Sequence, residues 1–100
     1  MGLFSAWRDK SAQQARKKDT MNHLVDFATT RKGVEAYFEM EGPRDPASLI
    51  LVARDGEWTR RPVPSEKDGA KIASELGVPF YEVIRTGYPQ RMRDWSAKNK

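Results

Sequence analysis

The sequence contains no cysteine and only one histidine, His23. Without cysteine the chain has no disulfide framework, no zinc ribbon and no thiol nucleophile. With one histidine, a metal site would depend almost entirely on carboxylates. The chain also lacks the glycine-rich nucleotide fingerprints and the HExxH zinc motif. These absences remove the commonest signatures of metal-dependent, thiol-dependent and nucleotide-binding enzymes, so we expect no cofactor and a protein that is not an enzyme.

Long hydrophobic runs are also missing. The longest apolar run, Leu49 to Ala53, is far shorter than the roughly 20 residues that cross a bilayer. The N-terminus, Met1-Gly-Leu-Phe-Ser, lacks the apolar stretch of a signal peptide. The 100 residues have the length of one domain. We therefore expect a small cytoplasmic domain without a membrane partner.

The net charge of +4 is distributed unevenly along the chain. Residues 1–18 hold five basic residues and one acidic residue, and residues 85–100 have the same balance, so each end carries +4. Residues 19–84 hold 8 basic and 12 acidic residues and carry −4. Because basic segments attract nucleic acids and other acidic partners, the charge points to the two ends of the chain. The alternative is that short basic tails only keep a small domain soluble.

Composition divides the chain into three regions. Residues 1–18 favour helix but lack a continuous apolar stripe, which predicts a basic tail that is poorly ordered or only conditionally helical. Residues 19–84 are expected to form a single α+β domain. Residues 85–100 are expected to form a basic, aromatic C-terminal helix or tail.

The order of elements within the domain follows from hydrophobic periodicity. A helix capped by Asp19 or Thr20 is expected first, with apolar residues on one face. Alternation over residues 34–41 predicts a half-buried strand, and residues 48–54 and 57–63 predict a hairpin with a two-residue Asp55-Gly56 turn. That turn would pair Ala53 with Trp58.

The second half of the domain is expected to add one helix and one strand. Ser65 and Asp68 have the spacing of a capping box, and Gly77 is a suitable helix end. Residues 80–84 are short and apolar, as in a fourth strand or an extended segment. The sequence thus predicts an α+β fold in the order α-β-β-β-α-β: a three- or four-stranded antiparallel sheet, two helices packed on one face and a short C-terminal helix.

Catalysis would require a pocket that brings His23 together with Glu35, Glu39 or Asp26. Glutamates on the polar face of a strand are more often simply solvated, and no nucleophile is arranged beside His23. Binding is better supported, because the C-terminal stretch mixes cations with aromatic residues, which suits phosphates and stacked bases. The candidate nucleic-acid contacts are Arg8, Arg16, Lys17, Lys18, Arg91, Arg93, Trp95, Lys98 and Lys100.

Two alternatives to RNA binding remain open. Tyr88, Met92 and Trp95 are spaced i, i+4 and i+7, which is typical of a helix that docks on its own core. The chain could also be a protein-interaction module or a homodimer in which the acidic middle of one copy receives the basic tail of another.

Two resemblances accompany these predictions. The stretches FATTRKGVEAYFE (27–39), LVARDGEWTRRPV (51–63), LGVP (76–79) and GYPQRMRDW (87–95) resemble a family of small, uncharacterised actinobacterial proteins, which implies placement and no particular activity. The order α-β-β-β-α over residues 19–76 is similar to the double-stranded-RNA-binding domain. That resemblance matches Gly42-Pro43 to a turn between strands, and Ser65 and Lys67 to a phosphate-binding helix start, but the middle here is acidic.

Overall fold

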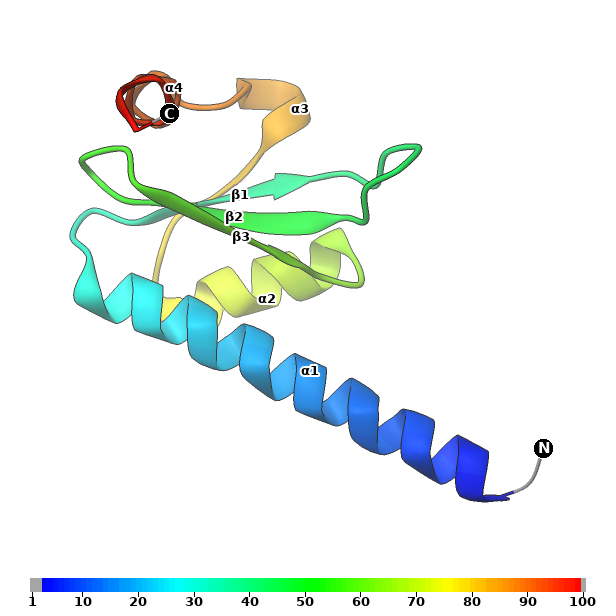
Figure 1. The fold of residues 1–100 in the computed structure, drawn as a ribbon. Coiled ribbons are helices and arrows are strands. Elements are labelled where there is room, and N and C mark those ends of the chain that lie inside the picture. The colour runs from blue at the N-terminus through cyan, green and yellow to red at the C-terminus, as the bar shows by residue number, and fades with distance from the viewer. Residues whose placement is uncertain (1–2, 100) are drawn as a thin grey trace.

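A four-stranded sheet lies between two layers of helices in the computed structural model (Figure 1). The structure describes the backbone of residues 3–99 and the side chains of residues 17–99. The elements are α1 (Leu3–Thr30), β1 (Glu35–Glu39), β2 (Ser48–Val52), β3 (Trp58–Pro62), α2 (Glu66–Leu76), β4 (Phe80–Glu82), α3 (Val83–Thr86) and α4 (Gln90–Lys98). The predicted α+β class and order of elements are therefore confirmed, except that the strand expected over residues 80–84 ends at Glu82 and the unpredicted helix α3 follows it.

The sheet is mixed, and this corrects the fully antiparallel prediction. Its strand order is β3-β2-β1-β4, in which β1, β2 and β3 pair antiparallel but β4 pairs parallel to β1. The physical reason is the connection from β3 to β4. Helix α2 returns the chain across the sheet, so β4 runs in the same direction as β3, and β3 runs in the same direction as β1.

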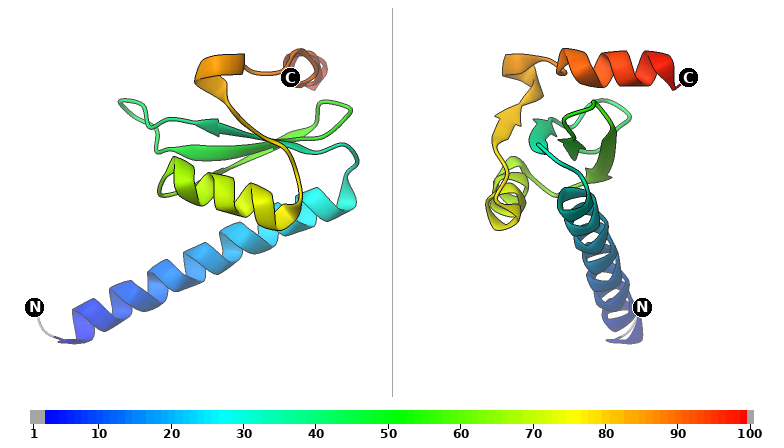
Figure 2. Two further views of the ribbon diagram at one scale, coloured as in Figure 1. Left: turned by 180° about the vertical axis from the view of Figure 1, so that it is seen from behind. Right: turned by 90° about the vertical axis from the view of Figure 1, so that its left-hand side faces the viewer.

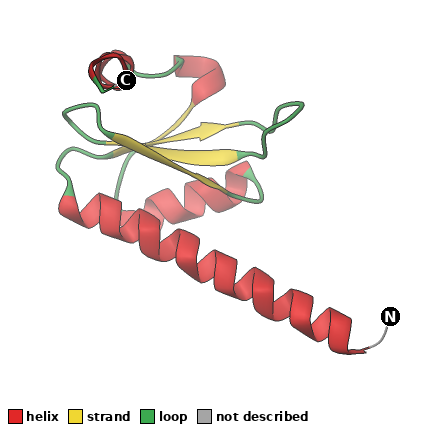
Figure 3. Ribbon diagram, in the orientation of Figure 1, coloured by secondary structure: helices red, strands yellow, loops and turns green. Residues whose placement is uncertain are grey.

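The two helices expected on one face of the sheet, α1 and α2, lie there, and α3 and the expected short C-terminal helix α4 cover the opposite face (Figure 3). Helices α1 and α2 cover a face built from Ala36, Phe38, Leu49 and Leu51. Helices α3 and α4 lie over the opposite face, where the buried cluster comprises Tyr37, Ile50, Val52 and Met92. The polar face of β1 therefore lies under a helix instead of facing water.

The β2–β3 hairpin has a different register from the predicted one. Val52 lies opposite Trp58, and the Ala53 amide donates to the Glu57 carbonyl, so the loop has three residues instead of two. A one-residue slip moves every side chain of a strand to the other face. Trp58 consequently joins Ile50 and Val52 beneath α4, and not the Leu49–Leu51 face.

Gly56 is the last residue of this three-residue loop and lies against α4. Its φ of 96° suits glycine, and a Cβ there would collide with the Arg91 carbonyl and lie 2.9 Å from Cβ of Trp95. Because Gly56 has no side chain, α4 can pack directly against the hairpin loop. This contact between distant segments leaves no trace in the local sequence.

Helix α1 is continuous from Leu3 to Thr30, so the predicted start at Asp19 or Thr20 is wrong. At 1.5 Å per residue its 28 residues span about 42 Å. Its C-terminal third packs on the sheet through Leu24 and Phe27. Its N-terminal half leads away from the sheet in every view (Figures 1 and 2). We call this half, residues 3–18, the arm.

The caps of α2 match the sequence prediction. The Ser65 Oγ accepts from the Asp68 amide at 3.2 Å, and Gly77 ends the helix at a φ of 72°. The caps place Glu66 in the first turn of α2, close to the end of β1. That placement contributes to a pocket described below.

Candidate functional site

The arm carries the N-terminal candidates for nucleic-acid binding. Lys17 and Lys18 are exposed, and the first described side chains with partial cover are Thr20 and Met21. The side chains of Arg8 and Arg16 lie outside the described part, although both residues are on the helical arm. The structure thus groups these four cations on one projecting helix.

The C-terminal candidates for nucleic-acid binding differ in their exposure and in their contacts. Arg93 and Lys98 are exposed on α4, and Lys100 lies outside the described residues. Arg91 instead forms an ion pair with Glu35, and its Nε donates to the Ala53 carbonyl at 3.0 Å. Trp95 is half-buried beside the hairpin loop. Arg91 is therefore paired within the fold, although the sequence analysis named it as a candidate nucleic-acid contact.

A polar network fixes α4 and the segment before it to the sheet. Glu39 binds Arg60 at 2.8 Å and accepts a hydrogen bond from the Tyr88 hydroxyl. Burial, together with that hydrogen bond, raises the pKa of Tyr88. Trp58 Nε1 donates to Ser96 Oγ at 2.8 Å. The sequence missed this network because its partners are far apart in the chain, and the even spacing of Glu35 and Glu39 was the only local sign.

His23 lies on the other face of the sheet, between α1 and β3. Its Nδ1 lies 3.2 Å from the Arg61 guanidinium and its Nε2 lies 2.5 Å from Thr59 Oγ1. Because arginine only donates, Nδ1 must accept, and Nε2 carries the proton. Burial and the Arg61 charge lower the pKa of His23. The proposed catalytic grouping with Glu35 or Glu39 is not assembled, since those glutamates lie beneath α4.

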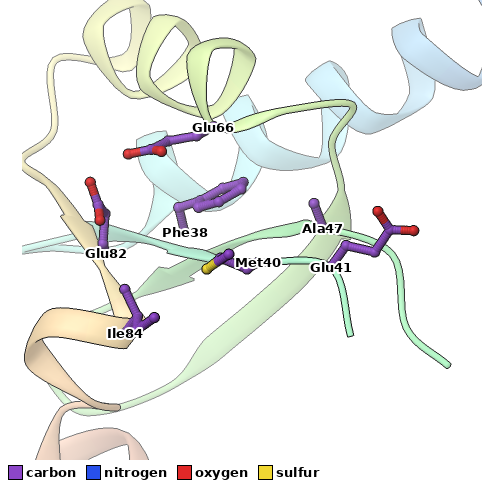
Figure 4. Close-up of a pocket in the computed structure, with 7 residues that line it drawn as sticks. All are labelled: Phe38, Met40, Glu41, Ala47, Glu66, Glu82 and Ile84. Atoms are coloured by element: carbon purple, nitrogen blue, oxygen red, sulfur yellow. The ribbon is translucent and has the colours of Figure 1, made fainter. Parts of the chain in front are cut away.

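A pocket opens where β1 ends, between α2 and α3 (Figure 4). Its volume is about 250 Å³, and Phe38, Met40, Ala47 and Ile84 supply apolar walls, with Glu41, Glu66 and Glu82 among them. Figure 4 shows the Glu66 side chain pointing toward Glu82, with Phe38 beside them. A hydrogen bond with Glu82, and then burial, raise the pKa of Glu66. The same hydrogen bond is the main cause that lowers the pKa of Glu82. The sequence analysis did not single out this pocket.

The described residues contain neither a candidate metal cluster nor a candidate membrane span. No group of three or more His, Asp and Glu side chains there could hold a metal ion. No helix in that part of the chain combines the length and the apolar character needed to cross a bilayer.

Comparison with known proteins adds no assignment. No family model, no curated protein and no solved structure matched this chain. Functional inference therefore rests on the arm, the C-terminal helix and the pocket.

Proposed function

We propose that this protein is a non-enzymatic binding protein that contacts RNA, free or within a nucleoprotein complex, through the arm. The observation that carries the proposal is the separation of the arm from the body. Residues 8–18 hold five cations, and this stretch lies on a helix that extends beyond the sheet (Figure 2). Lys17 and Lys18, the arm cations whose side chains the structure describes, are exposed and can neutralise phosphates.

The physics of isolated helices supports this reading. In proteins most helical stability comes from tertiary packing of an apolar face and not from helix propensity. The arm is polar around most of its circumference, so its own composition offers little packing. Basic segments of this kind gain order when phosphates of RNA neutralise their charge. RNA therefore supplies both the counter-charge and the surface that the arm lacks.

Helix α4 has a secondary role in this proposal. Arg93 and Lys98 are exposed, but α4 and α1 lie on opposite faces of the sheet. A short RNA strand bound along the arm does not need α4. Arg93 and Lys98 add phosphate contacts only with a ligand large enough to reach both faces.

Salt-dependent binding to a single-stranded RNA tests the proposal. We expect the affinity to fall as salt rises, with a log–log slope set by the number of phosphates neutralised. The double variant Lys17→Gln/Lys18→Gln should reduce that slope by about 1.4, at roughly 0.7 per phosphate on a single strand. Glutamine keeps the helix propensity of the arm, so the change removes charge alone.

The matched control removes two lysines from α2. Lys67 and Lys71 are exposed and lie one helical turn apart. The variant Lys67→Gln/Lys71→Gln changes the net charge equally and should leave the slope unchanged. If this control loses binding and the arm variant does not, the α2 surface is the RNA site and the arm proposal is wrong. Absence of any salt-dependent binding by the unmodified protein overturns RNA binding altogether.

A further inference from the structure

The pocket at the end of β1 presents apolar surface that the described side chains leave uncovered. Ile84 is 71% exposed and Met40 is 59% exposed, which are the largest exposures among the big hydrophobic side chains of the described residues. Both line the same pocket, together with the buried Phe38 ring. Clustered exposed apolar side chains beside a hollow are typical of an interaction site.

The charge of the pocket indicates what kind of partner fits. Glu41, Glu66 and Glu82 line it, and the only ion pair formed by these three within the described residues joins Glu82 to Arg85. Arg85 is itself 79% exposed, so it neutralises the pocket weakly. A suitable partner combines large apolar side chains for the walls with cations for the carboxylates.

The N-terminal segment of the chain has this composition. Leu3, Phe4 and Trp7 are its large apolar residues, and Arg8 and Lys10 follow directly. The next large apolar residue along the sequence is Met21, which lies beyond the arm. We infer that the pocket of one copy receives the N-terminal segment of the arm of a second copy, so that the protein associates head to tail.

The arm reaches a second copy more readily than its own pocket. Leu24 and Phe27 hold the C-terminal part of α1 against the sheet, and the helix continues unbroken from there. Its N-terminus therefore points away from the body (Figures 1 and 2). A head-to-tail contact of this kind gives a reciprocal dimer if two copies exchange arms, and a longer chain if they do not.

Sedimentation without RNA tests the inference on the full chain. We expect concentration-dependent association at low salt that weakens as salt screens the carboxylates. The variant Glu66→Gln/Ile84→Gln should raise the dissociation constant about tenfold or more, as loss of a central contact does. Ile84 is 71% exposed and Glu66 is also exposed, so neither substitution removes a core side chain and the fold should persist.

A control variant carries the same chemical changes outside the pocket. Glu75 is exposed on α2 and Val25 is 39% exposed on α1. The variant Glu75→Gln/Val25→Gln should associate as the unmodified protein does. Equal weakening by the control would mean that charge and hydrophobicity in general, and not this pocket, drive association, and the inference would fail.

Mixing two defective variants gives the sharpest test. Phe4→Ser/Trp7→Ser disables the arm and leaves the pocket, while Glu66→Gln/Ile84→Gln disables the pocket and leaves the arm. Each should be monomeric alone, and an equimolar mixture should form a dimer through the one intact arm–pocket pair. Two weakened variants that fail to associate when mixed would contradict the inference.

The outcomes separate this inference from RNA binding. The pocket variant retains Lys17 and Lys18, so its salt slope on RNA at concentrations below self-association should be unchanged. A monomer at every concentration and salt overturns the head-to-tail contact and leaves RNA binding standing. Association without RNA binding overturns the proposed function and leaves the head-to-tail contact standing.

Discussion

The two ends of this chain have the same net charge but different structural roles. Residues 1–18 and residues 85–100 each carry +4. The N-terminal cations lie on an arm that leads away from the body, and Lys17 and Lys18 are exposed. At the C-terminal end, Arg91 forms an ion pair with Glu35, and Met92 is buried. Charge along a sequence therefore does not show which cations are available to a ligand.

The comparison predicts that α4 contributes to stability and the arm does not. The largest effect is expected for Met92→Ala, because Met92 is 7% exposed within the cluster beneath α4. Truncation of a buried methionine costs about 2–5 kcal/mol, and we expect the lower part of that range at this peripheral site. Urea unfolding measures the loss. Met40→Ala, at 59% exposure, is the control and should change stability by less than about 0.5 kcal/mol.

The next largest loss of stability is expected for Arg91→Ala. It leaves Glu35 without its cation and the Ala53 carbonyl without its donor. Hydrogen bonds to charged groups contribute about 1.5–3 kcal/mol, and the partial exposure of both partners favours a loss of about 1.5 kcal/mol. The matched change Arg93→Ala, on an exposed position of the same helix, should cost less than about 0.5 kcal/mol. Similar losses from both would mean that Arg91 is no more committed to the fold than Arg93.

A smaller effect, dependent on pH, is expected where α1 joins the body. His23 faces Thr59 and Arg61 of β3, with Asp26 and Arg31 nearby on its own side. Its pKa is lowered in the folded state, so above its unfolded pKa of about 6.5 the neutral form contributes its full stability. That stability is lost as pH falls from about 6.5 through the folded pKa, because the unfolded chain then binds more protons.

Unfolding measured between pH 5 and 8 checks this expectation. His23→Gln should flatten the part of the stability curve below about pH 6.5 and leave the curve above it parallel to the original. A variant curve that keeps the same acid slope would show that carboxylates, and not His23, set it.

The smallest effect on stability is expected in the arm. Lys17→Gln/Lys18→Gln should change the free energy of unfolding by less than about 0.5 kcal/mol, since both side chains are exposed and no hydrogen bond or ion pair engages them in the described structure. The same variant should reduce the salt dependence of RNA binding, as given above. A large stability loss would mean that the arm packs on the body, and the contrast between the two ends would collapse.

Local patterns in the sequence predicted the elements well. The alternation of Glu35–Glu39, the capping pair Ser65 and Asp68 and the helix end at Gly77 all appear as expected. The spacing of Tyr88, Met92 and Trp95 also matches a docked α4, with Met92 buried. These features depend on neighbours within a few residues, which is why periodicity and capping rules can find them.

The errors arose where distant segments meet. The hairpin loop lies against α4 at Gly56, and the direction of β4 depends on the path of α2. The ion pair of Arg91 joins residues 56 positions apart. The pocket was missed because Phe38, Glu66 and Ile84 come from three separate elements. None of these arrangements can be derived from hydrophobic periodicity along the sequence. Each one can be predicted only after the order of the strands in the sheet is known.

The sequence by itself determined the class of fold, the order of its elements and the placement of charge at the two ends, because propensity, spacing and composition are local properties. The tertiary structure decided which of those charges are free. It brought Arg91 to Glu35 and left Lys17 and Lys18 on a projecting helix. The reason is that burial and pairing depend on which surfaces the folded chain brings together, and a partly buried carboxylate holds the cation that reaches it.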